Sequence, residues 1–271
     1  MTSELPLLFE KTDGIAALTF NRPEARNAIS PEVACRLADA FADVAEDPEV
    51  RVLILTGAGD RAFCSGGDLA LTLPLMTGAR QPETEWDHRL LDDPEVMSRS
   101  ALRGFELNKP IIAAINGPCM AGGMETVLAT DIRIAADHAT FALPEVRRGL
   151  IPFAGSLVRL PRQIPQCLAM EMLLTGDPIG AEQALAAGMI NRIVPHAELM
   201  ETAWTLARRI AGNGPVAVQE VKRTVLAASG VTLEEGYRME DAAKDRVMAS
   251  EDAREGPRAF MEKRPAVFRG R

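Results

Sequence analysis

Short, almost wholly apolar runs recur along the first two-thirds of the chain. Arg51–Thr56 contains Val52-Leu53-Ile54-Leu55, and Ile111–Ile115 repeats this composition. Runs of this kind are typical of strands that are covered on both faces of a parallel sheet. We expect further strands over Gly14–Phe20, Ile132–Ala135 and Ile190–Val194, the last of them short or at an edge.

Apolar residues at three- and four-residue spacing predict a helix after the first of these strands. Ser30-Pro31-Glu32 supplies an N-cap, a first-turn proline and a first-turn acid. The apolar face of this helix consists of Val33, Leu37, Phe41 and Val44. Because strands alternate with helical segments, the pattern predicts an α/β fold.

The composition changes in the last third of the chain, where helices dominate. From Ala197 onward the apolar positions lie in helices that are separated by Gly212-Asn213-Gly214-Pro215 and by Ser229-Gly230. We therefore expect two regions, an α/β core over residues 1–196 and a helical appendage over residues 197–271.

Between Leu71 and Asp93 the periodic pattern breaks down, and Pro74, Gly78 and Pro82 stand among mixed charges. We expect a mobile loop here. A connection of this length inside a compact domain is usually functional or disordered. The functional alternative is a lid over an apolar pocket.

Composition and charge indicate a folded protein and argue against general nucleic-acid binding. A chain of 271 residues with 47% hydrophobic content can bury a large core. Its net charge of -8 argues against general nucleic-acid binding, which needs a broad basic surface. Any phosphate that the protein binds must therefore be met by local cations.

The cysteines and histidines argue against a metal site. The lengths of the apolar runs predict a cytoplasmic protein. Cysteines stand at positions 35, 64, 119 and 167 without CxxC spacing, and the three histidines are scattered, so we expect neither a zinc site nor a disulfide framework. The first apolar run, Leu5 to Phe9, is too short for a signal peptide, and no stretch approaches the ~20 apolar residues of a membrane span.

Two glycine-containing loops carry the candidate chemistry. Phe63–Leu69 and Asn116–Glu125 each close a buried strand, and each can present a free backbone N–H group. Two such donors that converge on one carbonyl oxygen form an oxyanion hole. Leu143-Pro144-Glu145 adds a second carboxyl group to that of Glu125. The alternative is structural: the glycines let a helix approach a strand, and both acids are favourable in a first helical turn.

The loops belong to a longer ordered set of segments: Asn21–Ala28, Phe63–Leu69, Asn116–Glu125, Asp131–Ala135, Phe141–Glu145, Gly149–Pro152, Leu173–Gly176 and Glu255–Arg264. This set spans almost the whole chain and resembles the crotonase family, the enoyl-CoA hydratase/isomerase group. The resemblance implies a spiral core of ββα units. It also implies a C-terminal helical region that packs subunits into a homotrimer or a dimer of trimers.

The resemblance also implies a reaction, the addition of water across the double bond of a trans-2-enoyl-CoA thioester. The backbone N–H groups of Gly67 and Gly122 are then the oxyanion donors, and Glu125 and Glu145 hold one water between them. By the family's pattern Glu125 activates the water and Glu145 exchanges a proton with the α carbon, although the two share the water and the division of roles stays open.

Coenzyme A enters such a site as part of the substrate, and no permanently bound cofactor is expected. By resemblance, Arg22 and Arg26 are the local candidates for its phosphates; the alternative is a solvated basic loop. Phe260 and Lys263 match the part of the family chain that reaches the adenine and phosphate region, often across a subunit interface. The other substrate-binding candidates flank the glycine loops and the acids: Cys64, Ser65, Asp68, Leu69, Pro144 and Phe153.

The chain departs from the family pattern at three positions. Ala121 stands where many members have a third consecutive glycine, Phe153 follows Pro152 where a glycine is frequent, and Ser156 also replaces a common glycine. A phenyl ring at position 153 can narrow or reshape the acyl pocket, so the length and branching of the acyl chain are left open.

Several functions compete with hydration. An enoyl-CoA isomerase and a dehydratase of a specialised hydroxyacyl-CoA share the oxyanion hole and differ mainly in proton transfer. A non-catalytic acyl-CoA-binding protein and a scaffold protein are further alternatives. The presence of both Glu125 and Glu145 weighs against simple binding, because burying charge beside an acyl chain is costly.

Overall fold

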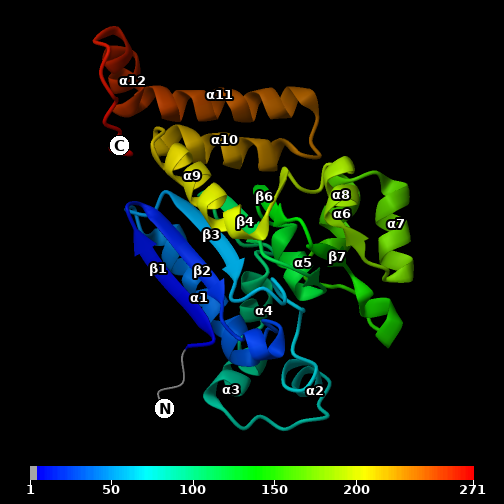
Figure 1. Ribbon diagram of the computed structural model, residues 1–271. Helices are drawn as coiled ribbons and strands as arrows, with labels where there is room; N and C mark the ends of the chain where they lie inside the picture. Colours follow the sequence, from blue (N-terminus) through cyan, green and yellow to red (C-terminus); the bar gives the residue numbers. More distant parts are fainter. Residues whose placement is uncertain (1–4) are drawn as a thin grey trace.

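A computed structural model describes residues 5–271 and shows a twisted sheet with helices on both faces (Figure 1). Residues 1–4, which precede the apolar run Leu5 to Phe9, lie outside the described residues. The six-stranded sheet has the order β1-β2-β3-β4-β6-β9, and all of its pairings are parallel except that of β1 with β2. Its strands are β1 (Leu7–Thr12), β2 (Ile15–Phe20), β3 (Val52–Gly57), β4 (Ile111–Ile115), β6 (Ile132–Ala136) and β9 (Arg192–Val194).

The predicted strands are confirmed, and β1 is an addition to them. β1 lies at the edge of the sheet, and of its residues only Leu7 is buried. An edge strand with polar residues along its second half lacks the apolar run on which the prediction relied.

The two faces of the sheet are covered by different helices. In β3, Val52 and Ile54 belong to the apolar cluster that includes residues of α9 (Leu199–Ala211). Leu53 belongs instead to the larger cluster on the other face, which includes α1 (Pro31–Glu46). This double cover explains why the strand is apolar at successive positions.

Helix α1 begins as its sequence predicts. The Ser30 hydroxyl accepts a hydrogen bond from the Val33 backbone nitrogen at 3.3 Å, and Pro31 occupies the first helical position. The N-cap and the apolar face therefore fix both the start and the orientation of this helix.

The chain after residue 196 is helical, as expected. Helix α9 packs against the sheet, whereas α10 (Pro215–Ala228) and α11 (Leu233–Ala249) lie side by side beyond it, with α12 (Asp252–Met261) at the far end (Figure 1). Helix α9 therefore belongs partly to the core of the sheet. The division of the chain into two regions at residue 196 stays a prediction. No helix within residues 5–271 is both long and apolar enough to cross a membrane.

A smaller three-stranded sheet lies beside the main one and consists of β5 (Cys119–Met120), β7 (Thr140–Ala142) and β8 (Ile179–Gly180). The helical segments of the first 200 residues, besides α1, are η1 (Pro23–Ala25), α2 (Thr72–Met76), α3 (Glu85–Asp92), α4 (Glu95–Ser100), α5 (Gly122–Val127), η2 (Pro144–Arg148), α6 (Ser156–Gln163), α7 (Gln166–Thr175), α8 (Ala181–Ala186) and η3 (His196–Glu198).

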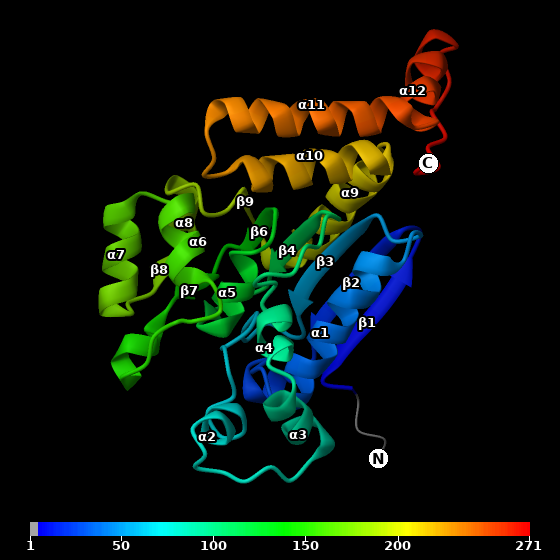
Figure 2. The same cartoon turned by 180° about the vertical axis from the view of Figure 1, so that it is seen from behind.

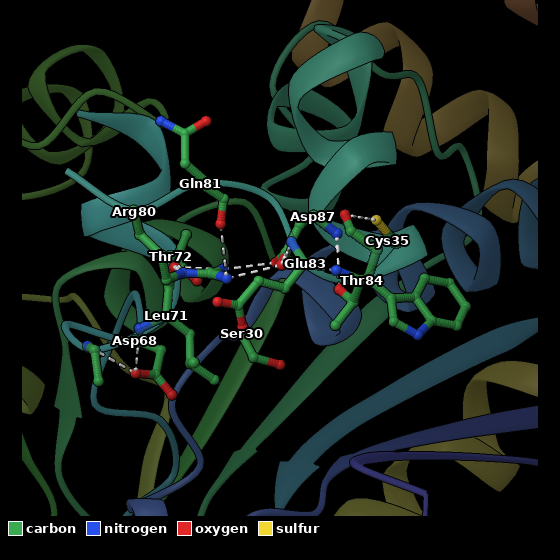
Figure 3. Close-up of polar contacts among 12 residues, drawn as sticks. Ser30, Cys35, Asp68, Leu71, Thr72, Arg80, Gln81, Glu83, Thr84 and Asp87 are labelled. Atoms are coloured by element: carbon green, nitrogen blue, oxygen red, sulfur yellow. Dashed lines mark hydrogen bonds and ion pairs between the residues drawn. The ribbon is translucent and has the colours of Figure 1, made fainter. Parts of the chain in front are cut away.

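The prediction of an irregular loop over residues 71–93 is wrong in part, because α2 and α3 form within it. Figure 3 shows what holds this segment: the Arg80 guanidinium donates to both carboxylate oxygens of Asp87, at 2.7 and 2.8 Å, and to the Leu71 carbonyl. Asp87 and Thr84 also cap each other's backbone at the start of α3. These contacts join residues without apolar periodicity, so the pattern did not reveal them. That the remaining loop moves as a lid stays a prediction.

The loops that follow β3 and β4 are locked to each other. The Met120 amide donates to the Cys64 carbonyl at 2.9 Å, and the Phe63 amide donates to the Pro118 carbonyl at 3.0 Å. Behind these bonds the backbones are so close that a Cβ atom on Gly123 would lie 2.6 Å from the Cβ of Cys64. No larger residue fits at position 123 without separating the loops.

We expect Gly123→Ala to lower the free energy of unfolding by about 2 kcal/mol or more, because the added methyl group overpacks a buried backbone contact. Chemical denaturation of the full chain measures this change. Gly236→Ala is the matched control: its new Cβ would meet only the Ala228 Cβ, at 3.7 Å, inside the exposed helix α11. It should stabilise the protein by roughly 0.5–1 kcal/mol through helix propensity. Equal effects of the two variants would contradict the proposed lock.

Candidate active site

A cavity of about 380 Å³ opens where the two glycine loops, α2, α5 and η2 meet. Most of its wall is apolar. The lining residues are Arg26, Ile29, Ser65, Gly67, Leu69, Thr72, Leu73, Met76, Met97, Ala101, Met120, Ala121, Gly122, Glu125, Thr126, Pro144, Glu145, Arg148, Leu150, Phe153 and Ala154.

The backbone N–H groups of Gly67 and Gly122 are both available to a ligand. Ile29 pairs with the Gly67 loop through the Gly66 carbonyl and the Asp68 amide, which leaves the Gly67 N–H on the opposite side. Gly122 is the first residue of α5, where backbone N–H groups have no partner within the helix. Neither nitrogen donates to another of residues 5–271, and a Cβ on Gly122 would lie only 3.6 Å from the Gly67 nitrogen.

The two amides are set by a strained residue next to them. Ala121, the N-cap of α5, has a φ of 49°, a backbone angle that residues other than glycine rarely adopt. A Cβ on Gly66 would lie 2.5 Å from the Cβ of Ala121, so the absence of a side chain at Gly66 makes room for the methyl group. Gly66, Ala121 and Gly122 thus form one closely packed unit.

Two buried asparagines shape the chain that leads from β3 into the first loop. The Asn27 side-chain amide donates to the carbonyls of Ala58 and Ala62, at 3.0 and 2.8 Å. Asn116, at the end of β4, accepts from the Gly57 amide at 3.1 Å and donates to the Gly59 carbonyl at 2.8 Å. These bonds satisfy backbone groups of a turn that no regular ladder could satisfy.

Glu125 lies in the first turn of α5 and is 4% exposed. Its Oε1 accepts hydrogen bonds from the backbone amides of Ala154, at 2.7 Å, and Ser156, at 3.4 Å. Burial raises the pKa of Glu125, while the two amides and the nearby Arg159 oppose this rise. One carboxylate oxygen is therefore fixed by the backbone.

Glu145 follows Pro144 at the start of η2 and presents a carboxyl group to the same cavity. Burial raises its pKa to about 7, and the charge of Glu125 adds to this rise. Its Oε2 is buried and has no hydrogen-bond partner among residues 5–271. The site therefore combines one carboxyl group fixed by amides with a second that holds a proton near neutral pH.

Sequence comparison places the chain in a known family. The sequence model of the family described as enoyl-CoA hydratase/isomerase matches residues 10–271. The chain belongs to the enoyl-CoA hydratase/isomerase family. This confirms the resemblance to the crotonases that the glycine loops and the two glutamates indicated.

Individual members of the enoyl-CoA hydratase/isomerase family are similar over nearly the whole length. Carnitinyl-CoA dehydratase from Proteus mirabilis is 38% identical over 265 residues, which is 95% of each chain. Enoyl-CoA hydratase EchA19 from Mycobacterium tuberculosis is 39% identical over 264 residues, 97% of this chain and 96% of the relative. The crystal structure of an enoyl-CoA hydratase from Bacillus anthracis matches with a TM-score of 0.88 at 34% identity, over 98% of this chain and all of that one. The predicted crotonase-like α/β fold with a helical C-terminal region is thus confirmed.

Most of the residues that the family resemblance singled out meet at the cavity. They are Arg26, Ser65, Gly67, Leu69, Gly122, Glu125, Pro144, Glu145 and Phe153. Arg26 lines the cavity, and its guanidinium makes no hydrogen bond or ion pair within residues 5–271. The ring of Phe153 is 48% exposed.

Three of the predicted substrate-binding residues lie behind the cavity wall instead. The Arg22 guanidinium donates to Asp68 and to the Ala28 carbonyl, both at 2.8 Å. Asp68 also accepts from the backbone amides that follow it, and Cys64 is fully buried against Gly123. These three side chains hold the loop that carries Gly67, and the structure does not bring them to the cavity.

Phe260 and Lys263 lie far from the cavity of their own chain. Phe260, in α12, is 82% exposed, and Figures 1 and 2 place α12 at the opposite end of the molecule from α2, which lines the cavity. Their predicted contact with coenzyme A across a subunit interface stays a prediction.

Sequence reasoning missed the groups that fix Glu125. The amides of Ala154 and Ser156 are backbone donors, which leave no signature in the side chains. The Ser156 hydroxyl is also fully buried and has no partner among residues 5–271. The replacement of a common glycine at this position was the available signal, and it marked a residue that contacts the site.

The raised pKa of Glu145 predicts a cost to stability. Its unperturbed value is 4.5 and its value in the folded protein is about 7, so the folded state binds the proton more tightly and loses stability as the pH rises from 4.5 to 7. Glu145→Gln keeps the neutral form. Because the carboxyl group is partly open to solvent, we expect a gain of only ~1 kcal/mol at pH 8, or roughly 2–4 °C in Tm, and almost none at pH 5.

Thermal unfolding of the wild-type chain and the variant at both pH values measures this gain. Glu171→Gln is the control, since Glu171 is an exposed carboxylate on α7 without an ion-pair partner in the described part of the chain. Its effect on Tm should not differ between the two pH values. A pH-independent effect of Glu145→Gln would argue that the Glu145 carboxyl group is not perturbed.

Proposed function

We propose that this chain is an enoyl-CoA hydratase, which adds water across the double bond of a trans-2-enoyl-CoA thioester. The observation that carries the proposal is the pair of carboxyl groups: the buried, unpartnered Oε2 of Glu145 lies in the same cavity as the amide-fixed carboxylate of Glu125. A buried polar atom without a partner needs one, and a substrate water supplies it.

The thioester carbonyl binds to the backbone N–H groups of Gly67 and Gly122. Attack on the β carbon moves negative charge onto the carbonyl oxygen as an enolate, and these two donors stabilise that charge. The loss of one such donor typically costs about 10²–10³ in rate. The apolar walls from α2 and Phe153 receive the acyl chain, and Arg26 meets a phosphate of coenzyme A, which the substrate itself supplies.

The two glutamates divide the proton transfer. Glu125, held by two amides and near Arg159, is the base that takes a proton from water as the oxygen attacks the β carbon. Glu145, with a pKa of about 7, is the acid that gives its proton to the α carbon. After the addition Glu125 carries a proton and Glu145 is ionised, so the pair contains one proton before and after the step.

The reverse reaction is the second candidate. Relatives named carnitinyl-CoA dehydratase are 38% identical over 95% of this chain, and the same two carboxyl groups can remove water from a hydroxyacyl-CoA. An enoyl-CoA isomerase shares the amide pair and needs no water. The assembly that we propose is the family's trimer, alone or paired into a hexamer.

Purified protein mixed with a series of trans-2-enoyl-CoA chain lengths should remove the conjugated enoyl-thioester absorbance, and the fastest member defines the acyl preference. Glu145→Gln should lower kcat by about 10²–10⁴ because the α-carbon proton donor is lost. Thermal stabilisation by the acyl-CoA should persist in this variant. Glu171→Gln should react like the wild-type chain. Hydration at the wild-type rate by Glu145→Gln would exclude the two-glutamate mechanism.

The pH dependence of kcat/KM should fall above about pH 7 with a single-proton slope, because the active pair must keep one proton and Glu145 loses it there. Dehydration of the corresponding 3-hydroxyacyl-CoA should show the same alkaline limb, since the equilibrium constant does not change with pH. Initial rates at subsaturating substrate in both directions measure the two profiles. A profile that stays flat from pH 6 to 9 would show that the Glu145 proton is not required.

A further inference from the structure

Arg159, on α6, contacts backbone carbonyls from three separate segments around the cavity. Its Nη1 donates to the Ala101 carbonyl at 3.0 Å and its Nη2 to the Leu102 carbonyl at 2.5 Å. Nη1 also lies 3.4 Å from the carbonyls of Glu125 and Ala154. No carboxylate of residues 5–271 forms an ion pair with this guanidinium.

The local backbone is built around the guanidinium. Leu102 has a φ of 52°, which is unusual for a leucine, and its carbonyl accepts the shortest of the Arg159 bonds. Gly155 has a φ of 120°, and a Cβ there would lie 2.8 Å from Nη1 of Arg159. Two conformations that ordinary residues avoid therefore occur where the backbone meets this one side chain.

Arg159 and the Glu125 carboxylate hold opposite ends of the same residue. The Ala154 amide donates to Glu125 Oε1 at 2.7 Å, and the Ala154 carbonyl faces Arg159. A change in the position of Arg159 therefore changes the donor that fixes the carboxylate.

Few charges face Glu125. Arg159 on α6 is its cationic neighbour and Glu145 on η2 is its anionic one. Arg148, also on η2, lies beside Glu145, and Arg103, after α4, lies beyond Arg159. Burial raises the pKa of Glu125, the amides of Ala154 and Ser156 oppose this rise most, and the positive charge of Arg159 opposes it further.

We propose that Arg159 is a positioning residue for Glu125, which fixes the loop that binds the carboxylate and supplies a positive charge that favours its ionised form in the free enzyme. The proposal rests on the proposed function, in which Glu125 must be ionised to accept a proton from water. Arg159 acts through Glu125 and through the Ala154 loop, and it needs no contact with substrate.

Two variants separate the contribution of the Arg159 charge from that of its hydrogen-bond geometry. Arg159→Lys keeps the charge and loses the fork of donors. Arg159→Met keeps an apolar stem and loses the charge. Arg103→Met is the matched control, because Arg103 Nη1 donates to the Phe153 carbonyl at 3.0 Å and so joins the same two segments from farther away.

The first measurement is the acid limb of kcat/KM for enoyl-CoA hydration, which reports protonation of Glu125. In Arg159→Met we expect this limb to move up by about one pH unit, because an opposite charge is lost beside a buried carboxylate. In Arg159→Lys we expect roughly tenfold lower kcat/KM with the limb unmoved. In Arg103→Met we expect the limb unmoved. Arg159→Gln serves as the second neutral variant if Arg159→Met does not fold.

The second measurement does not depend on turnover. In protein labelled with ¹³C at the glutamate carboxyl carbon, the Glu125 resonance is identified by its absence in Glu125→Gln and titrated by NMR. Its midpoint should rise in the neutral variants and stay in Arg159→Lys and Arg103→Met. An unmoved midpoint in the neutral variants, or an equal rise in Arg103→Met, overturns the proposal. If the wild-type chain hydrates no enoyl-CoA, the proposed function fails, and this titration still decides whether Arg159 sets the charge of Glu125.

Discussion

The geometry of the site depends on one close contact between two backbones, that of Gly123 with Cys64. Strands β3 and β4 are parallel, so their carboxyl ends reach the same edge of the sheet and their loops must meet there. The missing side chain at Gly123 lets the loops join through the bond from the Met120 amide to the Cys64 carbonyl. Gly67 follows Cys64 in the chain and Gly122 precedes Gly123. Their backbone amides therefore lie near the same junction and face one cavity, although they are distant in sequence. The sheet and its two apolar clusters serve as the rigid support for this junction.

The carboxyl group of Glu125 is buried and that of Glu145 is partly buried, and burial of a carboxyl group lowers the stability of a protein. Two backbone donors and a neighbouring cation partly offset the burial of Glu125, whereas Glu145, with Arg148 beside it and no donor to its Oε2, has a pKa of about 7. In the proposed function, the difference between the two environments separates an acid from a base of the same residue type. The strain at Ala121 belongs to the same pattern, in which a local cost at the site is carried by the surrounding core.

The sequence predicted the elements whose signals are local. The Ser30 cap, the apolar runs of β3 and β4, and the glycines at the ends of those strands all correspond to features of the structure. The sequence could not predict contacts that depend on distant backbone, such as the amides at Ala154 and Ser156 that bind Glu125. It also assigned Arg22 and Asp68 to the substrate, although each satisfies the other, because a pairing 46 residues apart leaves no spacing signal. The helices α2 and α3 were missed for a similar reason: each buries a single leucine, Leu75 or Leu90, and the ion pair between Arg80 and Asp87 joins them.

In the proposed function, the attachment of α2 sets the wall that receives the acyl chain largely apart from the groups that perform the chemistry. Thr72, Leu73 and Met76 line the cavity, yet α2 is tied to α3 through Arg80 and Asp87, and α3 rests on α1 through the ion pair of Arg89 with Asp39. The glutamates and the Gly122 amide are held by other segments, and α2 meets the Gly67 loop only at its first turn, where the Thr72 and Leu73 amides donate to the Asp68 carbonyl. If the proposed function holds, a lineage of such enzymes can exchange the side chains of this wall, and with them the range of acyl groups, while it inherits the two glutamates unchanged.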